Sequence, residues 1–230
     1  MRRSEINRYI QEAIGFCRRQ NFHLPFWSLW SPRQWEQAGH EADEIRQRML
    51  GWDVTDFGSG DFASGGLLLF TIRNGPPGGT RDPMAKDYCE KLLLVGEDQV
   101  TPTHFHFAKM EDIINRAGGT LVMELWQADR ATEQPDLQSP VTVAIDGIRQ
   151  AVVPGQRVLL EPGQSITLPP YLYHRFHALR GAGMVLGGEV SRVNDDARDN
   201  RFQQPLPRFP AIEEDAPPLH LLCMEYPPAR

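Results

Sequence analysis

The sequence predicts an all-β fold in which a β-barrel carries a helical arm at its N-terminus. From Trp52 onward, short apolar runs alternate with segments rich in Gly and Pro, a pattern typical of a sandwich or barrel. Before that point, apolar residues recur at helical spacing. No long linker or repeat divides the 230 residues. We therefore expect one structural domain, with a helical arm over 1–51 and a barrel with a C-terminal extension over 52–230.

The arm is expected to begin with an amphipathic helix over residues 4–20, for which Ser4 is a suitable N-cap. Its apolar residues at helical spacing are Ile6, Ile10, Ile14 and Cys17. A second helix should begin at Ser31 and Pro32, because Ser caps helices well and Pro suits the first helical position. The residues of this helix that we expect to pack inward are Trp35, Ala38, Ile45 and Met49.

The segment between the two helices is rich in aromatic residues. They are Phe22, Phe26, Trp27 and Trp30. One interpretation is a cover over a mouth or face of the barrel, either its own or that of a partner. The other is a lining for the substrate site. We favour the cover.

The strands of the barrel are predicted from apolar runs separated by turn residues. These runs span residues 65–73, 90–95, 120–126, 141–145, 156–160, 165–168 and 183–187. Segment 74–79 and the pair Gly118–Gly119 stand where a hairpin needs positive φ or a sharp bend. Short strands with such turns between them favour a barrel over an open sheet with crossover helices.

The composition excludes several classes of function. The net charge is −6 and basic residues do not cluster, so no nucleic-acid partner is expected. No apolar run approaches the length of a membrane span, and the N-terminus lacks the apolar core of a signal peptide, so we expect a cytoplasmic protein without a membrane partner. Cys17, Cys89 and Cys223 are odd in number and widely spaced, which indicates buried apolar residues rather than disulfides or a zinc site.

A metal site is indicated by His104, His106 and Glu111, which lie in one short segment. In a strand, residues 104 and 106 share a face, so both imidazoles can enter the same cavity. Two neutral nitrogens and one anionic oxygen suit Mn, Fe, Co, Ni or Zn and leave room for a fourth ligand. His174 is the candidate for that ligand, because a turn, a short strand and the corner Pro169–Pro170 deliver it to a defined position.

Three further residues are candidates for proton transfer. Lys91 opens an apolar strand and is expected either to face the barrel interior or to lie at a solvent-facing edge. Lys109 stands between two ligands in the sequence, and its side chain points either toward the metal or away from it. Glu189 follows Gly187 and Gly188, and a carboxylate beside a divalent ion can serve as a general base. The alternative for Glu189 is a structural ion pair.

The segment 194–202 combines acidic, amide and basic residues. Most of it is expected to form a self-paired loop, but loops at the mouth of a barrel also carry residues that determine specificity. Asp196 and Arg201 are our candidates for substrate binding. Polar groups of this kind suit a ligand with many hydroxyl groups.

The two histidine segments resemble the paired motifs of the cupin superfamily, His-x-His-x4-Glu at 104–111 and Gly-x5-Pro-x4-His at 163–174. The second departs from the usual pattern, because Tyr171 stands where cupins usually carry Gly. Other segments are similar to the D-lyxose isomerase family of cupins. They are residues 21–25, 90–95, 100–115, 189–196, 199–202 and 222–226. This resemblance runs nearly end to end and implies a single cupin barrel of the jelly-roll type.

The resemblance further implies a Mn²⁺-dependent isomerase, in which other divalent metals such as Co²⁺ can substitute. It implies interconversion of D-lyxose with D-xylulose, and also of D-mannose with D-fructose, by a homodimer that acts on free monosaccharides. The metal ligands of the family carry over onto His104, His106, Glu111 and His174. The chemistry fits proton transfer through a cis-enediol. Glu189 would move the proton between C2 and C1, and Lys109 or Lys91 would move the hydroxyl proton.

Other functions share this ligand set. Cupin dioxygenases use Fe or Ni with O₂ and keep the surroundings of the metal apolar, whereas two lysines and a polar loop favour a sugar here. A sugar-binding or sensor module would need no turnover, but no DNA-binding segment accompanies the barrel. A phosphosugar isomerase would need a cluster of cationic or backbone N–H groups around a phosphate. No phosphate loop is present, although Arg198 and Arg201 keep this alternative open.

Overall fold

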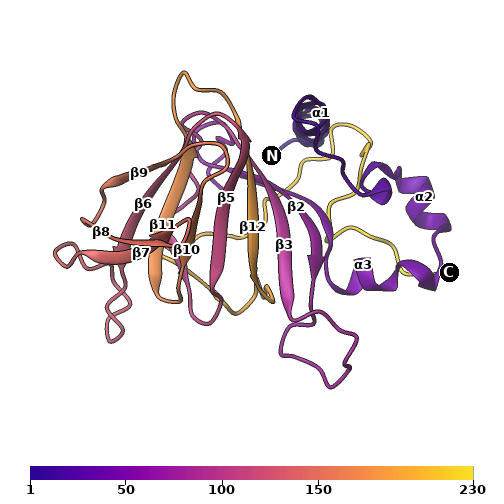
Figure 1. Ribbon diagram of the computed structural model, residues 1–230. Helices are drawn as coiled ribbons and strands as arrows, with labels where there is room; N and C mark the ends of the chain where they lie inside the picture. Colours follow the sequence, from indigo (N-terminus) through magenta and orange to yellow (C-terminus); the bar gives the residue numbers. More distant parts are fainter. Residues whose placement is uncertain (230) are drawn as a thin grey trace.

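A computed structural model describes residues 1–229 and shows two antiparallel sheets that face each other across a shared interior (Figure 1). The larger sheet contains, in spatial order, β1 (Gly51–Thr55), β2 (Leu67–Asn74), β3 (Tyr88–Val95), β12 (Val185–Arg192), β5 (Glu111–Gly118), β10 (Ser165–Leu168), β7 (Val141–Ile145) and β8 (Ile148–Val152). The smaller sheet contains β13 (Asn200–Phe202), β4 (His104–His106), β11 (Leu172–Ala178), β6 (Leu121–Gln127) and β9 (Arg157–Leu160). The chain crosses between the sheets at several connections, which include β4 to β5 and β10 to β11. The predicted all-β barrel is confirmed.

The first helix of the arm, α1 (Arg3–Arg19), begins one residue earlier than predicted. Its N-cap is Arg2, because Glu5 in the first turn accepts a hydrogen bond from the Arg2 backbone N–H at 3.0 Å. Ser4 therefore does not cap the helix. Its hydroxyl instead donates a hydrogen bond to Asp215 of the C-terminal extension at 2.7 Å.

The second helix begins where predicted but does not continue as one element. In α2 (Pro32–Gln37), Ser31 caps the start, and its backbone N–H donates to Gln34 Oε1 at 2.9 Å. Gly39 then breaks the helix, and the chain continues through the 3₁₀ turn η2 (His40–Ala42) into α3 (Asp43–Gln47). The prediction that Met49 packs inward was wrong, since its side chain is 42% exposed just after the last helix.

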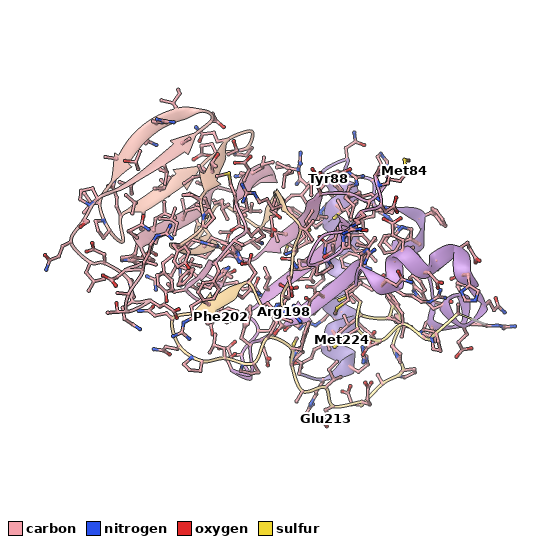
Figure 2. All side chains as sticks on the ribbon, turned by 90° about the horizontal axis from the view of Figure 1, so that it is seen from below. Met84, Tyr88, Arg198, Phe202, Glu213 and Met224 are labelled. Carbon is pink, nitrogen blue, oxygen red and sulfur yellow. The ribbon has the colours of Figure 1, made fainter. Side chains whose placement is uncertain are left out.

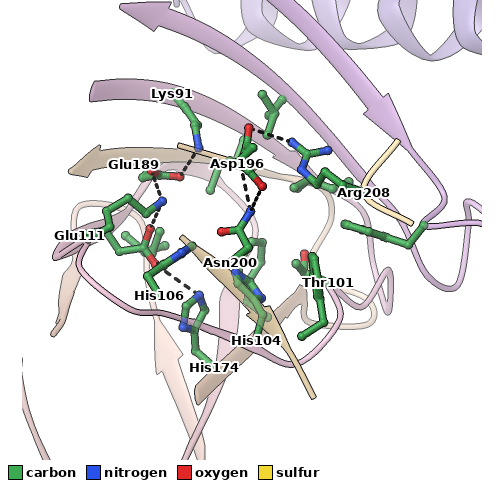
Figure 3. Close-up of a pocket in the computed structure, with 18 residues that line it drawn as sticks. Lys91, Thr101, His104, His106, Glu111, His174, Glu189, Asp196, Asn200 and Arg208 are labelled. Atoms are coloured by element: carbon green, nitrogen blue, oxygen red, sulfur yellow. Dashed lines mark hydrogen bonds and ion pairs between the residues drawn. The ribbon is translucent and has the colours of Figure 1, made fainter. Parts of the chain in front are cut away.

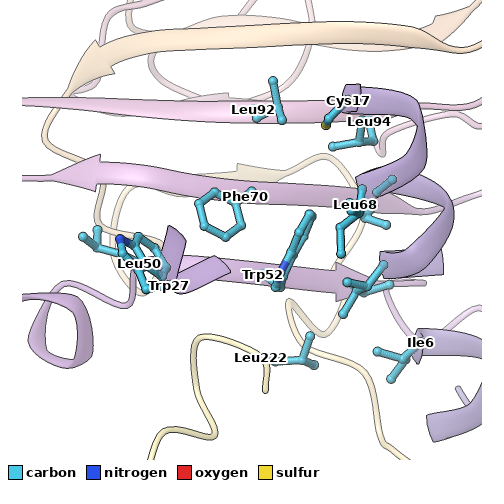
Figure 4. Packing of buried hydrophobic residues seen from close by; sticks show 14 of the residues in the cluster. Ile6, Cys17, Trp27, Leu50, Trp52, Leu68, Phe70, Leu92, Leu94 and Leu222 are labelled. Atoms are coloured by element: carbon cyan, nitrogen blue, oxygen red, sulfur yellow. The ribbon is translucent and has the colours of Figure 1, made fainter. Parts of the chain in front are cut away.

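The aromatic segment between the helices covers the outer face of the larger sheet. Its 3₁₀ turn η1 (Phe26–Leu29) places the ring of Trp27 5.0 Å from that of Phe70 on β2, centroid to centroid. Trp35 of α2 stacks on Tyr226 of the C-terminal extension at 4.0 Å. Figure 4 shows Trp27, Phe70 and Trp52 side by side in this cluster. The predicted cover is therefore confirmed for the protein's own sheet.

The C-terminal extension returns to the helical arm, and Figure 1 shows it in yellow beside the helices. Arg3 is buried in α1 and forms ion pairs with Glu214 and Glu225. The bridge between Trp52 and Leu222 ties the extension to β1. Arm, sheet and extension share one apolar cluster. The single domain, with its arm over 1–51 and barrel over 52–230, stays a prediction.

The opposite face of the larger sheet lines the barrel interior. One end of this interior is filled by aliphatic side chains that include Met123, Leu125 and Ile166. Cys17, Cys89 and Cys223 are buried and free, as predicted. None of the helices among the described residues is long and apolar enough to cross a membrane.

Candidate metal centre and active site

Three histidines converge at the end of the barrel interior that the aliphatic core leaves open. His104 and His106 project from β4, and His174 on β11 pairs with His104 across the two strands. Their ligand atoms all lie within 4.8 Å of one another. Figure 3 shows the three rings at the bottom of one cavity. The period of two along a strand therefore places them as the sequence predicts.

Backbone carbonyl groups orient two of these rings. Nδ1 of His104 lies 2.7 Å from the Pro102 carbonyl oxygen, and Nδ1 of His174 lies 3.1 Å from that of Leu172. Because a carbonyl oxygen only accepts, each Nδ1 carries the proton and each Nε2 keeps its lone pair. Burial lowers the pKa of His174 to about 4 and the pKa of His104 well below its usual range, so both rings are neutral near pH 7.

Glu111 opens β5 and completes the group. Its Oε1 lies 3.2 Å from Nε2 of His174 and 3.4 Å from Nε2 of His106. This oxygen is buried and has no hydrogen-bond partner among the described residues. A bound cation would supply the missing partner. Three imidazole nitrogens and one carboxylate oxygen form a donor set that suits divalent transition metals. The residues therefore fit a metal cofactor.

Two lysines and a second carboxylate lie next to the histidines. Nζ of Lys109 lies 2.9 Å from Glu111 Oε2 and 2.8 Å from Glu189 Oε1. Lys91 on β3 stands opposite Glu189 in register, with its Nζ 3.4 Å from Glu189 Oε2 and 2.7 Å from Asn194 Oδ1. All four charged side chains are buried. The structure thus brings the three predicted proton-transfer residues together and directs both lysines inward.

The charges in this cluster stabilise one another. Burial alone would raise the pKa of Glu189, but Lys109 and Lys91 outweigh it and hold that pKa below its usual value. Burial would likewise lower the pKa of Lys109, but Glu111 and Glu189 outweigh it and raise that pKa. Glu189 is therefore an anion and Lys109 a cation near neutral pH. Ser191 donates a further hydrogen bond to Glu189 Oε1 at 2.9 Å, which leaves Oε2 as the less occupied oxygen.

The opposite side of the cavity is polar as well. Asn200 donates a hydrogen bond to Asp196 Oδ1 at 3.1 Å, and Arg208 lies 3.5 Å from Asp196 Oδ2 and 2.5 Å from Asp53 Oδ2. Burial tends to raise the pKa of Asp196, but Arg208 above all, with Lys91 and Lys109, holds it far below its usual range. The structure therefore brings Asp196 to the cavity, as predicted, together with two residues that the sequence analysis did not select.

The structure does not bring Arg201 to the cavity. On β13, Asn200 pairs with His106 and Phe202 with His104, so these two residues share the inner face. Arg201 lies between them and points outward, where its Nε is 2.9 Å from Glu133 Oε2. Figure 2, seen from below, labels Phe202 on β13 and Arg198, which precedes this strand.

Asn200 and Arg208, which the sequence analysis did not select, differ in how strongly the sequence indicates them. Asn200 is adjacent to the chosen Arg201, and a strand register would have distinguished them. Arg208 stands between Pro207 and Phe209 in the C-terminal extension, and no local pattern connects it to the histidines. Only the return of the extension across the barrel mouth places it in the cavity.

Tyr171 occupies the corner before β11 in a left-handed conformation, with φ at +61°. This conformation favours glycine, which explains why cupins usually carry glycine there. Hydrogen bonds secure it here, since the Tyr171 N–H donates to the His106 carbonyl at 2.9 Å and its own carbonyl accepts from Ala128 at 2.9 Å. Its ring stacks on Phe105 at 5.1 Å. The departure from the motif is therefore compatible with the position of His174.

A family model described as D-lyxose isomerase matches residues 1–226. The chain belongs to the D-lyxose isomerase family. The resemblance seen in the sequence is therefore confirmed, and with it the prediction of a sugar isomerase, an intramolecular oxidoreductase. Because the chain belongs to this family, the alternative function of a cupin dioxygenase is set aside.

Named relatives agree with this family. The chain is 51% identical to the D-lyxose/D-mannose isomerase of Serratia proteamaculans and 50% identical to that of Escherichia coli O157:H7, each over 98% of both chains. Among solved structures, a mutant L-ribose isomerase of Acinetobacter sp. DL28 in complex with L-ribose aligns with a TM-score of 0.62 at 13% identity, covering 93% of this chain and 98% of that one. The L-ribose isomerase of Cellulomonas parahominis with L-ribose aligns with a TM-score of 0.59 at 14% identity, over 93% and 98%. These structural likenesses show the fold.

Proposed function

We propose that the protein is a metal-dependent aldose–ketose isomerase that interconverts D-lyxose with D-xylulose and D-mannose with D-fructose. The names of the two relatives at about half identity support this choice of sugars. The observation that carries the proposal is the arrangement of Glu189, which lies between two lysines and beside the three histidines and Glu111. A base, a cation and a metal site in one buried layer are what an enediol reaction requires.

We propose His104, His106, Glu111 and His174 as the ligands of the metal, and Mn²⁺ as the metal, with Co²⁺ able to substitute. When bound, this ion supplies Lewis-acid polarisation of the sugar carbonyl. The unpartnered Oε1 of Glu111 and the free Nε2 atoms of His104 and His174 support this assignment. The choice of Mn²⁺ rests on the resemblance to the family, because the donor set alone accommodates several metals.

The protein's own side chains then move the protons. In our proposal, Glu189 removes the proton from C2 of the open-chain aldose through Oε2, the oxygen with fewer partners, and returns it to C1. Lys109 contacts both Glu189 and the proposed metal ligand Glu111, so we assign to it the transfer of the hydroxyl proton between O1 and O2. Lys91 orients the second oxygen of Glu189. General acid–base catalysis of this kind contributes about 10²–10⁴-fold in rate.

We propose Asp196, Asn200 and Arg208 as the residues that bind hydroxyl groups of the sugar. A carboxylate, an amide and a guanidinium together accept and donate hydrogen bonds, as a polyol requires. Among the described residues that line the cavity, each of the cations Lys91, Lys109 and Arg208 already faces a carboxylate. A phosphate would therefore find no unpaired cation, and a free monosaccharide is favoured over a phosphosugar.

The cellular setting and the assembly are also proposals. We propose a homodimer, as the family resemblance implies, and a cytoplasmic location. Light scattering coupled to size-exclusion chromatography measures the assembly directly, and a mass of one chain would contradict it.

The test of the proposed function follows proton transfer in D₂O. Metal-stripped protein is incubated with D-lyxose or D-mannose, with and without Mn²⁺, and ketose formation and deuterium uptake are followed by NMR. Metal-dependent ketose that carries deuterium is expected. Ketose without deuterium would point to a hydride shift or a shielded proton, and no ketose from metal-loaded protein would overturn the proposal. A matched Glu189→Gln protein controls for a contaminating isomerase.

A further inference from the structure

Thr101 has a buried hydroxyl that finds no partner. Its residue is only 2% exposed, it lines the cavity of the three histidines, and its Oγ1 has no hydrogen-bond partner among the described residues. Leaving a buried hydroxyl unpaired is energetically costly, so an unpaired hydroxyl in a binding cavity is a candidate for contact with a ligand. Other unpartnered atoms of this lining, His106 Nδ1 and Glu111 Oε1, belong to ligands already assigned to the metal.

The position of this hydroxyl is fixed by the backbone. The Thr101 N–H donates to the Phe176 carbonyl at 3.0 Å, which ties the segment to β11. Pro102 follows directly and restricts Thr101 to an extended conformation. The Pro102 carbonyl in turn accepts the hydrogen bond that orients His104. The same short segment therefore fixes the position of the Thr101 hydroxyl relative to the ring of His104, a proposed metal ligand.

The hydroxyl lies away from the reacting groups. In Figure 3, Thr101 and Arg208 stand on one side of the cavity, whereas Lys91, Glu111 and Glu189 stand on the other. Arg208 also has a buried nitrogen, Nη1, without a hydrogen-bond partner. A sugar whose C1 and C2 react beside Glu189 would extend its remaining carbons toward this side. Two unpartnered polar atoms there match the hydroxyl groups that these carbons carry.

We propose that Thr101 binds a hydroxyl group of the open-chain sugar beyond C2 and thereby contributes to the choice of substrate. This inference rests on the proposed function, because it takes the ligand to be an aldose. The loss of one neutral hydrogen bond of typical strength corresponds to about a three- to tenfold change in kcat/KM. A site built to bond a hydroxyl also discriminates against analogues that lack it.

The test combines variants with deoxy sugars. The kcat/KM values of wild-type, Thr101→Val and Thr101→Ser enzymes are measured with D-lyxose, D-mannose, 5-deoxy-D-lyxose, 4-deoxy-D-mannose and 6-deoxy-D-mannose. Val keeps the shape of Thr but lacks the hydroxyl. We expect about a three- to tenfold loss for Thr101→Val on the full sugars, near wild-type values for Thr101→Ser, and no further loss on the deoxy sugar that lacks the contacted hydroxyl.

Two controls separate binding from structure. Thr103→Val changes a nearby threonine that lies outside the cavity lining of the described residues, and it should keep kcat/KM within about twofold. The melting temperature of Thr101→Val without sugar should equal or exceed that of the wild type, because an unpaired buried hydroxyl is removed. A lower melting temperature with equal losses on every sugar would indicate a structural role and overturn the inference.

The remaining outcomes are also decisive. Full kcat/KM of Thr101→Val on every sugar would show that the hydroxyl makes no contact with substrate. Failure of the wild-type, metal-loaded enzyme to convert either full sugar would instead overturn the proposed function, and this inference with it. The two failures are thus distinguished by the wild-type measurement.

Discussion

The barrel interior has two layers that differ in chemistry although the same strands build both. On β3, Lys91 is followed two residues later by Leu93, and on β5 Glu111 is followed by Ile113. Residues two apart on a strand share a face, so each of these pairs places one side chain in the charged layer and the next inward side chain in the apolar layer. The charged layer holds the proposed ligands and catalytic residues, and the apolar layer stabilises the barrel around them.

The charged side chains tolerate burial because they are paired with one another. An isolated buried charge costs several kcal/mol, whereas Lys109 lies between Glu111 and Glu189 and each carboxylate faces a cation. The cavity lining of the described residues pairs three cations with three carboxylates. The apolar layer, in contrast, gains its stability from area removed from water and needs no partners.

The largest expected effect is the loss of a ligand from the charged layer. Glu111→Gln removes the anionic donor and leaves Lys109 with one carboxylate. Because metal polarisation contributes several kcal/mol, kcat/KM should fall by at least about 10³-fold, and the protein should retain less Mn²⁺. Steady-state kinetics and elemental analysis measure both. Full metal content with wild-type turnover would remove Glu111 from the ligand set.

The second effect concerns the base in the same layer. Glu189→Gln should lower kcat by about 10²–10⁴-fold while the metal content stays near the wild-type value, since Glu189 is not a proposed ligand. The rate of deuterium exchange at C2 should fall in parallel. If kcat were unchanged, proton abstraction would have to be assigned to another group.

The third effect tests the apolar layer alone. Ile166→Ala removes a fully buried side chain of β10 that does not line the cavity, and should lower the free energy of unfolding by about 2–5 kcal/mol. Below the melting transition, kcat/KM should remain within about twofold. Chemical denaturation and kinetics on the same samples test this. The exposed Ile148 on β8 provides the matched control, because Ile148→Ala should change stability by less than about 0.5 kcal/mol.

The smallest effects come from two neighbours at the cavity mouth. Asn200→Ala removes an inward amide and should raise KM by about three- to tenfold, since one hydrogen-bonding group is lost. Arg201→Ala removes an outward side chain and should leave KM within about twofold. Kinetics with D-lyxose compare the two. A larger effect from Arg201 would contradict the strand register described above.

Local patterns predicted much of this molecule. The period of two placed His104 and His106 on one face, and the turn residues marked most strands of the barrel. Some strands escaped prediction for a physical reason. Strand β8 is largely exposed at a sheet edge, so it carries no apolar run. The break after α2 was likewise missed, although Gly39, two residues beyond the end of that helix, is a local helix-breaking signal.

The sequence by itself determined the fold class, the helical arm, the histidine and glutamate donors and the family, because these depend on residues close together in the chain or on similarity over its length. The tertiary structure alone decided that Asn200 and not Arg201 faces the cavity, that Arg208 crosses the barrel mouth, and that the Thr101 hydroxyl is left without a partner. These outcomes depend on strand register and on the path of a distant segment. Both are set by long-range packing, which no local pattern encodes.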